Sequence, residues 1–368
     1  MKTVLVFFGG QSVEHDVSII TGVMTLNSID KTKYSALPVY INQKGEWLFG
    51  KNLYDIDEYK KLKQEKLSRV LLRGGSNILY EIKGKRLKKI AEVSLAINCM
   101  HGERGEDGSL SGLLNMCKIP IASPDILSSS VAMDKAFTKK IASALKIKTL
   151  PCITITEKDG VDGLIEKTKE LEFPLIVKPN RLGSSIGINS AKDQLELESA
   201  VNYALRFGDI AVIEPCLEDF IEINCSAYLR ADGSVRVSEC ERPVGRNKVL
   251  SFDDKYRFGK RVFPADIDKK TARTIKNYTE KLYRELRCKG VIRIDYFLHN
   301  GKVYLNEINT VPGSLAYYLF CDTLKEFGVM LNELLEVALK DGATLSSLQT
   351  EFSTGILSFT GGKSAKRL

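Results

Sequence analysis

The alternation of apolar and polar residues predicts an α/β protein. Thr3–Phe8 is a continuous apolar run that ends in Gly9-Gly10, and an amphipathic stretch follows over Val17–Ser28. This order predicts a buried strand, a glycine turn and a helix, and the N-terminus of such a helix favours an anionic ligand. The turn lacks the G-x-G-x-x-G spacing, so it does not by itself indicate a dinucleotide site.

Further strands and helices are predicted along the whole chain. The predicted strands are residues 36–41, 47–49, 78–82, 86–90, 93–97, 147–155, 175–178, 211–214, 222–228, 235–241 and 262–264. The predicted helices are residues 110–116, 195–207, 269–287 and 329–339, with a capped helix entry over 124–140 and a charged helix or loop over 55–68. The first third is typical of an open α/β sheet whose ligand-facing loops follow the carboxyl ends of its strands. Boundaries near residues 123 and 210 divide the chain into units 1–123, 124–210 and 211–368.

A predicted hairpin over Val291–Ile308 brings polar residues together near its end. The Asn-Gly dipeptide between its two alternating runs is a strong turn signal. Side chains alternate along a strand, so Glu307 and Asn309 share a face, with Asp295 within reach on the partner strand. Such oxygen ligands suit Mg²⁺ held together with substrate phosphates. An ordinary hairpin with a charged solvent face is the alternative, and the Pro-Gly turn that follows favours the metal site.

Other segments are candidates for anion or nucleotide binding. Arg293 shares the face of Asp295 and is either a salt-bridge partner or an anion clamp. The glycine- and serine-rich loop that begins at Lys178, KPNRLGSSIGI, can direct N–H groups and hydroxyls at phosphate, with a flexible surface hairpin as the alternative. The strand that ends at Glu214 could carry an adenine pocket, although core packing explains most such strands.

Composition excludes several classes of protein. The residues are 43% hydrophobic and 27% charged, which is ordinary for a globular protein. The chain of 368 residues is too long for one compact core. No apolar run reaches about 18 residues and the N-terminus lacks a signal-peptide pattern, so no membrane span is expected. The eight cysteines form no C-x-x-C pair, which indicates reduced thiols in a cytoplasmic protein. The net charge of +8 is dispersed, which fits a small anionic substrate rather than nucleic acid.

Several ordered motifs resemble those of the D-alanine–D-alanine ligases, an ATP-grasp family. They span nearly the whole chain and read GGQSVEHDVS, HGERGEDGSLSGLL, MDKAFTK, KPNRLGSSIG, DDKY, RID and NEINTVPG. The resemblance implies a Rossmann-like N-terminal domain, a central ATP-grasp subdomain with the phosphate loop, and a C-terminal ATP-grasp subdomain with the metal site and a lid loop over 253–260. It also implies ATP-dependent joining of two D-alanines through an acyl phosphate, which supplies peptidoglycan synthesis and so cell shape.

The resemblance assigns roles to individual residues. Those that would bind ATP are Lys135, Lys178, Ser185, Glu214, Leu217, Glu222 and Lys255. Those that would hold two Mg²⁺ ions, or Mn²⁺, are Asp295, Glu307 and Asn309. Those that would hold the first substrate or stabilise the oxyanion are Glu14, Ser184, Tyr256, Arg293 and Gly313, with His101 nearby. Those that would contact the second substrate are Ser314, Tyr318 and Leu319. The implied partners are small molecules only, with a homodimer in the cytoplasm and neither nucleic acid nor membrane.

Two departures from the family pattern leave the second substrate open. After Pro-Gly the family usually continues Met-Thr-x-x-Ser-Leu, whereas this chain has SLAYYL. In ungapped register Tyr318 replaces the serine, and alternatively Ser314-Leu315 supplies a shifted copy. The start of the lid is also altered, to Ser251–Asp254. A ligase that joins D-alanine to D-lactate, D-serine or another amino acid is therefore the alternative, and a nucleotide-binding protein without turnover is a third hypothesis.

Overall fold

The N-terminal part of the chain forms a seven-stranded sheet. The structure is a computed structural model that describes residues 1–183, 185–245, 260–349 and 351–355. The strands of this sheet lie in the order β6 (Arg86–Glu92), β5 (Ser76–Lys83), β4 (Ser68–Arg73), β3 (Trp47–Phe49), β2 (Tyr34–Ile41), β1 (Lys2–Gly9) and β7 (Leu95–Asn98). The buried strand β1 pairs in parallel with both β2 and β7, while β3 to β6 extend the sheet in antiparallel fashion.

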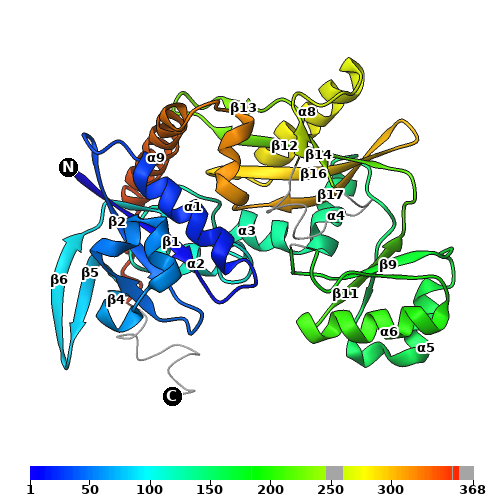
Figure 1. Cartoon of the computed structure of the whole chain (residues 1–368), viewed down its shortest axis with the longest axis horizontal. Coiled ribbons are helices and arrows are strands. Elements are labelled where there is room, and N and C mark those ends of the chain that lie inside the picture. Colours follow the sequence, from blue (N-terminus) through cyan, green and yellow to red (C-terminus); the bar gives the residue numbers. More distant parts are fainter. Residues whose placement is uncertain (184, 246–259, 350, 356–368) are drawn as a thin grey trace.

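Helices cover both faces of this sheet. Helix α1 (His15–Ser28) packs on one face beside α9 (Leu324–Ser346), so the last described helix of the chain joins the N-terminal core (Figure 1). Helix α2 (Ser109–Met116) packs on the opposite face, where Leu110 and Leu114 contact the β1 side chains Leu5 and Phe7. The loops after β1 and β7 lie at the carboxyl ends of parallel strands, where ligands bind in open α/β sheets.

A second sheet lies in the middle of the chain. Its order is β10 (Asn189–Ala191), β9 (Leu175–Pro179), β11 (Ala211–Pro215) and β8 (Ile153–Ile155). Helices α5 (Gly160–Thr168) and α6 (Gln194–Ala204) supply Leu164, Leu197 and Val201 to its core. Because β11 pairs with β9, this sheet extends to Pro215, past the expected boundary at residue 210.

A third sheet carries the hairpin singled out in the sequence. Its order is β13 (Val235–Val237), β12 (Ile221–Leu229), β16 (Val291–His299) and β17 (Lys302–Asn309). Helices α8 (Lys269–Glu285), α3 (Ile126–Met133) and α4 (Lys135–Ala144) contact this sheet. The remaining described elements are β14 (Arg242–Val244), β15 (Lys260–Val262) and the 3₁₀ segments η1 (Lys51–Tyr54), η2 (Ile56–Lys61), η3 (Gln64–Lys66), η4 (Glu157–Asp159), η5 (Leu205–Phe207) and η6 (Gly313–Leu319).

The α/β fold and most predicted elements are confirmed, but several boundaries were wrong. The strand expected over 147–155 is confined to β8, because Thr149 forms only an isolated bridge with Leu305. The strand expected over 235–241 ends at Val237, since the Ser238 hydroxyl accepts the Ser226 N–H at 3.0 Å and interrupts the ladder. The predicted helix entry over 124–140 is two helices, α3 and α4. The strand expected over 262–264 is β15, which begins and ends two residues earlier.

Other expectations differ in length or fall outside the described residues. The helix predicted over 329–339 extends to the full length of α9, because an N-cap at Thr323 starts it earlier. The segment 55–68 forms short 3₁₀ turns. Residues 253–259 of the expected lid loop lie outside the described residues. No described helix is long and apolar enough to cross a membrane.

Candidate active site

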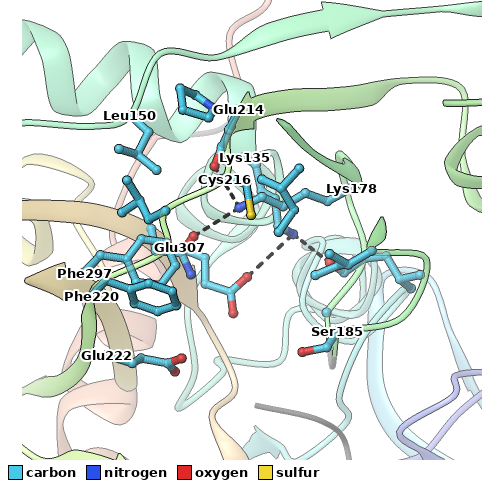
Figure 2. A pocket seen from close by; sticks show the side chains of 17 residues that line it. Lys135, Leu150, Lys178, Ser185, Glu214, Cys216, Phe220, Glu222, Phe297 and Glu307 are labelled. Atoms are coloured by element: carbon cyan, nitrogen blue, oxygen red, sulfur yellow. Dashed lines mark hydrogen bonds and ion pairs between the residues drawn. The ribbon is translucent and has the colours of Figure 1, made fainter. Parts of the chain in front are cut away.

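A pocket lies between the second and third sheets, next to the start of α4. Figure 2 shows its lining residues, with Glu222 beside the rings of Phe220 and Phe297 and with Ser185 across from them. The lining residues include these predicted ATP contacts: Lys135, Lys178, Ser185, Glu214, Leu217 and Glu222. Apolar side chains such as Leu150 and Ile176 complete the wall. A pocket with apolar walls and a few convergent charges suits a nucleotide.

Two buried lysines share one buried carboxylate at the end of β11. Lys178 Nζ lies 2.9 Å from Glu214 Oε2, and Lys139 Nζ lies 2.7 Å from Glu214 Oε1. Glu214 is 0% exposed, so the pairs are shielded from water. Burial opposes ionisation, but the charges of Lys178 and Lys139 hold the pKa of the Glu214 carboxyl below its ordinary value. Glu214 therefore fixes the position of Lys178.

Lys135 connects the helix α4 to the phosphate loop and to the third sheet. The Asp134 side chain caps α4 by accepting the Phe137 N–H at 2.9 Å, so the helix begins at Lys135. Lys135 Nζ donates to the Leu182 carbonyl at 2.6 Å and lies 3.7 Å from Glu307 Oε2. The ammonium group thus stands between the loop and a predicted metal ligand, where phosphate charge would be neutralised.

An aromatic pair forms another wall of the pocket. The rings of Phe220 and Phe297 meet edge to face with centroids 4.6 Å apart. Phe297 lies opposite Glu222 in the register of β12 and β16, which places the ring beside this carboxylate. Such a wall can stack against a base while a carboxylate binds ribose hydroxyls. Three predicted residues, Ser184, Lys255 and Tyr256, lie outside the described residues.

The hairpin places the predicted metal ligands together. Asp295 pairs with Glu307 in the register of β16 and β17, and Arg293 pairs with Asn309. Asn309 Nδ2 donates to Asp295 Oδ2 at 3.1 Å. Two carboxylates and an amide oxygen are a donor set that fits Mg²⁺ together with phosphates. Within the described residues no group of three or more His, Cys, Asp and Glu side chains is arranged for a metal ion, so phosphate oxygens and water would complete the coordination.

Arg293 is a salt-bridge partner of the same cluster. Its Nε donates to Asp295 Oδ1 at 2.7 Å and its Nη2 donates to Asp295 Oδ2 at 2.9 Å. Asp295 is buried, and the bidentate pair fixes the plane of the guanidinium. An arginine held in this way presents positive charge beside the metal ligands without moving.

A β-bulge in the hairpin directs one more side chain into the pocket. Asp295 pairs with Glu307 whereas Tyr296 pairs with Leu305, so Asn306 is the extra residue of β17. Asn306 Oδ1 accepts a hydrogen bond from Lys178 Nζ at 3.2 Å. The bulge therefore lets consecutive residues, Asn306 and Glu307, both line the pocket.

Glu14 and His101 lie in the loops after β1 and β7, and the charges of Glu14 and Arg293 both act on His101. Glu14 precedes α1, is 6% exposed, and its Oε2 would lie 3.5 Å from a Cβ added at Gly183 of the phosphate loop. Both ring nitrogens of His101 have partners, because Nδ1 lies 2.6 Å from the Val311 carbonyl and Nε2 lies 3.0 Å from the Thr21 hydroxyl. Burial lowers the pKa of His101, so its neutral form is favoured.

Glu106 joins the N-terminal loop to the turn after β17. Its Oε2 accepts the Gly102 N–H and its Oε1 accepts the Val311 N–H, each at 2.9 Å. Its carbonyl accepts the Thr310 hydroxyl at 3.1 Å. Burial, together with the charge of Glu14, raises the pKa of the Glu106 carboxyl to about 8. These contacts join the loop after β7 to the turn that follows the hairpin.

The residues predicted to contact the second substrate lie in η6. Tyr318 lies beside Arg293, and burial raises the pKa of its hydroxyl while the Arg293 charge opposes that rise. Arg261 Nη1 donates to the Tyr318 carbonyl at 3.1 Å, and its guanidinium lies 5.0 Å from the ring centroid. The Ser314 N–H donates to Thr21, and Leu319 is buried in the N-terminal core. Of these three, Tyr318 is the one that lies against Arg293, the residue predicted to stabilise the oxyanion.

Sequence reasoning missed several residues that shape the site. They are Thr21, Glu106, Lys139, Arg261 and Asn306. Lys139 follows Lys135 by one helical turn, which was a usable signal that both face the same side of α4. The other four depend on contacts between segments far apart in the chain. Glu106 and Asn306 stand inside two of the quoted motifs, but their spacing alone did not indicate these contacts.

Comparisons with known proteins agree with this geometry. Two family models match, "D-ala D-ala ligase N-terminus" over residues 3–124 and "D-ala D-ala ligase C-terminus" over residues 141–340. A curated D-alanine–D-alanine ligase of Thermosipho africanus is 34% identical over 92% of this chain and 93% of its own length. A second, from Nitratiruptor, is 36% identical over 86% of this chain and 89% of its own length.

Two solved structures have the same overall fold. The VanG D-Ala:D-Ser ligase from Enterococcus faecalis aligns with a TM-score of 0.79 at 26% identity, covering 92% of this chain and 99% of its own. The D-alanine–D-alanine ligase from Helicobacter pylori aligns with a TM-score of 0.75 at 29% identity, covering 96% of this chain and 100% of its own.

Proposed function

The chain belongs to the D-alanine–D-alanine ligase family, and we propose that it uses ATP to join two molecules of D-alanine through an acyl phosphate. The observation that carries this proposal is the meeting of three charged groups at one cleft. They are the pocket lysines, the Arg293–Asp295 cluster of the hairpin, and Glu14 from the N-terminal sheet. A nucleotide-binding protein without turnover would not require the second and third groups.

The first step is activation of a carboxylate, which is a poor acceptor for an amine. The carboxylate of the first D-alanine attacks the γ-phosphorus of ATP, the bond to the β-γ bridging oxygen breaks, and ADP leaves. Lys135 and Lys178 neutralise phosphate charge, and Glu14 binds the ammonium of the first substrate. Asp295, Glu307 and Asn309 fit Mg²⁺ by their chemistry, and bound Mg²⁺ would supply further neutralisation of the phosphates.

The second step is attack by the amine of the acceptor on the acyl phosphate. The carbonyl oxygen gains negative charge, phosphate then leaves, and the amine loses its proton. Arg293 and the Gly313 N–H are the proposed donors to this oxyanion, and such a donor is typically worth about 3 kcal/mol. The ion pair with Asp295 keeps the Arg293 guanidinium oriented before the charge on the oxyanion develops, so little reorganisation is needed.

A ligase that uses another acceptor is the second candidate function. In ungapped register Tyr318 replaces the serine that the family usually has, with the Arg261 guanidinium 5.0 Å from the centroid of its ring and the Arg293 charge next to its hydroxyl. The similar fold of a protein described as a D-Ala:D-Ser ligase supports this candidate. Both candidates share the activation step and differ only in the acceptor pocket.

Measurement of ADP release tests the proposal. The purified chain would be supplied with ATP, Mg²⁺ and D-alanine, alone and with D-lactate or D-serine, and each product would be identified by mass. The D-alanyl-D-alanine dipeptide from D-alanine alone, and its predominance in the mixtures, is the expected result. If a mixed product dominated, D-lactate or D-serine would be assigned as the acceptor in place of D-alanine. ATP binding without ADP release would refute the ligase function.

The proposed biological role follows from the proposed product. The dipeptide would enter peptidoglycan synthesis in the cytoplasm and so contribute to cell shape. We further propose a homodimer, which the family resemblance implies and light scattering of the purified chain would test.

A further inference from the structure

The turn between β17 and η6 is held by the N-terminal domain at several atoms. The Val311 N–H donates to Glu106, the Val311 carbonyl accepts from His101, and the Thr310 hydroxyl donates to the Glu106 carbonyl. The Ser314 N–H at the far end of the turn donates to Thr21. This turn follows the metal ligand Asn309 directly and contains Gly313.

Glu106 is the member of this network that can set the turn most firmly. Its two carboxyl oxygens each accept one backbone N–H, from Gly102 on one side and Val311 on the other, both at 2.9 Å. Gly102 is adjacent to His101, and the His101 ring binds the Val311 carbonyl. The Glu106 carboxyl group therefore holds the backbone on both sides of the His101–Val311 hydrogen bond. Glu106 is 9% exposed and Thr310 is 2% exposed, so water cannot easily replace these bonds.

We propose that Glu106 is a positioning residue, which holds the turn Thr310–Gly313 so that the Gly313 N–H is aimed at the oxyanion of the acceptor step. The inference rests on the proposed function, because it assumes that Gly313 is an oxyanion donor. It assigns a role to a residue that touches neither substrate nor phosphate. A donor displaced by about 1 Å can lose much of its effect on an oxyanion.

The consequence for the reaction is specific to the second step. ATP binding depends on the pocket lysines, the Phe220–Phe297 wall and Glu222, none of which contacts Glu106 in the described hydrogen bonds. A displaced Gly313 N–H slows attack by the acceptor amine, while the acyl phosphate still forms. Water then has time to hydrolyse the acyl phosphate, so ADP is released without dipeptide.

The test variant is Glu106→Gln in the full-length chain. Glutamine has the same size, but whichever way its amide is oriented, the N–H of either Gly102 or Val311 loses its acceptor. We expect kcat for dipeptide formation to fall about tenfold or more, with dipeptide per ADP falling below one and ATP affinity unchanged within about twofold. Glu103→Gln is the matched control, since Glu103 is an exposed residue of the same loop.

Amide hydrogen exchange of residues 310–314 provides a readout that needs no turnover. Glu106→Ala removes both acceptor oxygens, so faster exchange in Glu106→Ala than in Glu103→Ala is expected, because the Val311 N–H is released. If Glu106→Gln does not fold, Thr310→Val removes another bond to the same turn and should lower the dipeptide to ADP ratio in the same direction.

The outcomes separate this inference from the proposed function. An active wild-type chain whose Glu106→Gln variant keeps kcat and coupling, with only a lower melting temperature, would overturn the positioning role alone. Unchanged exchange at 310–314 would overturn it as well. A wild-type chain that forms no dipeptide or mixed product would refute the proposed function, and the inference with it.

Discussion

Lys178 and Glu214 form a buried ion pair, with Nζ and Oε2 2.9 Å apart, where the second sheet lines the candidate nucleotide pocket. Lys139 binds the other oxygen of Glu214. A buried pair of this kind contributes little net stability when intact, because desolvation offsets the attraction. Its use is geometric, since it keeps the Lys178 ammonium in place although the side chain is long and has many rotamers.

Replacement of Glu214 by alanine is therefore expected to destabilise the fold and weaken nucleotide binding. Two buried ammonium groups would lose their counter-charge, and breaking such a pair typically costs about 3–5 kcal/mol. Chemical unfolding and a titration with ATP would measure the two effects. Glu218→Gln is the control, because Glu218 is an exposed carboxylate shortly after β11. Equal stability of the Glu214 and Glu218 variants would contradict the structural role of the pair.

Arg293→Ala is expected to remove most turnover while leaving ATP affinity nearly intact. Arg293 contacts Asp295 through two nitrogens and lies outside the residues that line the nucleotide pocket. Loss of one oxyanion donor typically lowers kcat by about 10²–10³-fold. The measurements are kcat for dipeptide formation and the dissociation constant of ATP. Arg273→Ala, at an exposed position of α8, serves as the control. Unchanged turnover in Arg293→Ala would eliminate the oxyanion assignment.

The sequence predicted those parts of the fold and site that depend on local pattern. The period-two alternation of the hairpin predicted that Asp295, Glu307 and Asn309 share a face, and the register confirms it. It could not predict the bulge at Asn306, because a bulge depends on how a strand fits its neighbour. The same limit applies to Lys139 and Glu214, since their pairing requires α4 to pack against β11.

The contacts between domains were the least predictable. His101 was expected near the first substrate, and the structure shows that its ring nitrogens bind Val311 and Thr21. Glu106 and Val311 are 205 residues apart in the chain, so no local periodicity connects them. Only the packed tertiary structure brings a backbone N–H to a particular carboxylate oxygen.

Tyr318→Phe is expected to raise KM for the acceptor while ATP affinity stays constant. The Tyr318 hydroxyl lies beside Arg293, the proposed oxyanion donor, and Arg261 donates to the Tyr318 carbonyl, so this hydroxyl is a candidate donor to the acceptor carboxylate. Loss of a hydrogen bond to a charged carboxylate typically costs about 1.5–3 kcal/mol, which corresponds to about tenfold or more in KM. Initial rates at varied acceptor concentration provide the measurement.

The neighbouring tyrosine offers a matched control for this change. Tyr317→Phe removes a hydroxyl from the same 3₁₀ segment, where the Tyr317 ring packs against Phe327 in the N-terminal core. Its acceptor KM should match that of the wild-type chain. If Tyr318→Phe also kept the acceptor KM of the wild-type chain, the acceptor carboxylate would have to bind elsewhere in η6, for example at the shifted Ser314-Leu315 copy.

Stability is expected to fall as pH decreases below about 6.5, and His101 should account for part of the loss. Burial lowers the pKa of His101 in the folded chain below its ordinary value of 6.5. The unfolded chain therefore binds the proton first, so the contribution of neutral His101 is fully present above pH 6.5 and is lost as pH falls toward the folded pKa. Protonation would also remove the acceptor at Nε2 that faces the Thr21 hydroxyl.

Melting temperatures of the wild-type chain and of His101→Gln between pH 5 and pH 8 would test this expectation. Glutamine does not titrate, so the advantage of the wild-type chain should shrink as pH falls. His299→Gln is the control, because His299 lies on the β16–β17 turn, away from the interdomain contact. Its difference from the wild-type chain should change less between these pH values. Parallel curves for the wild-type chain and His101→Gln would show that the neutral imidazole between Thr21 and Val311 does not contribute to stability.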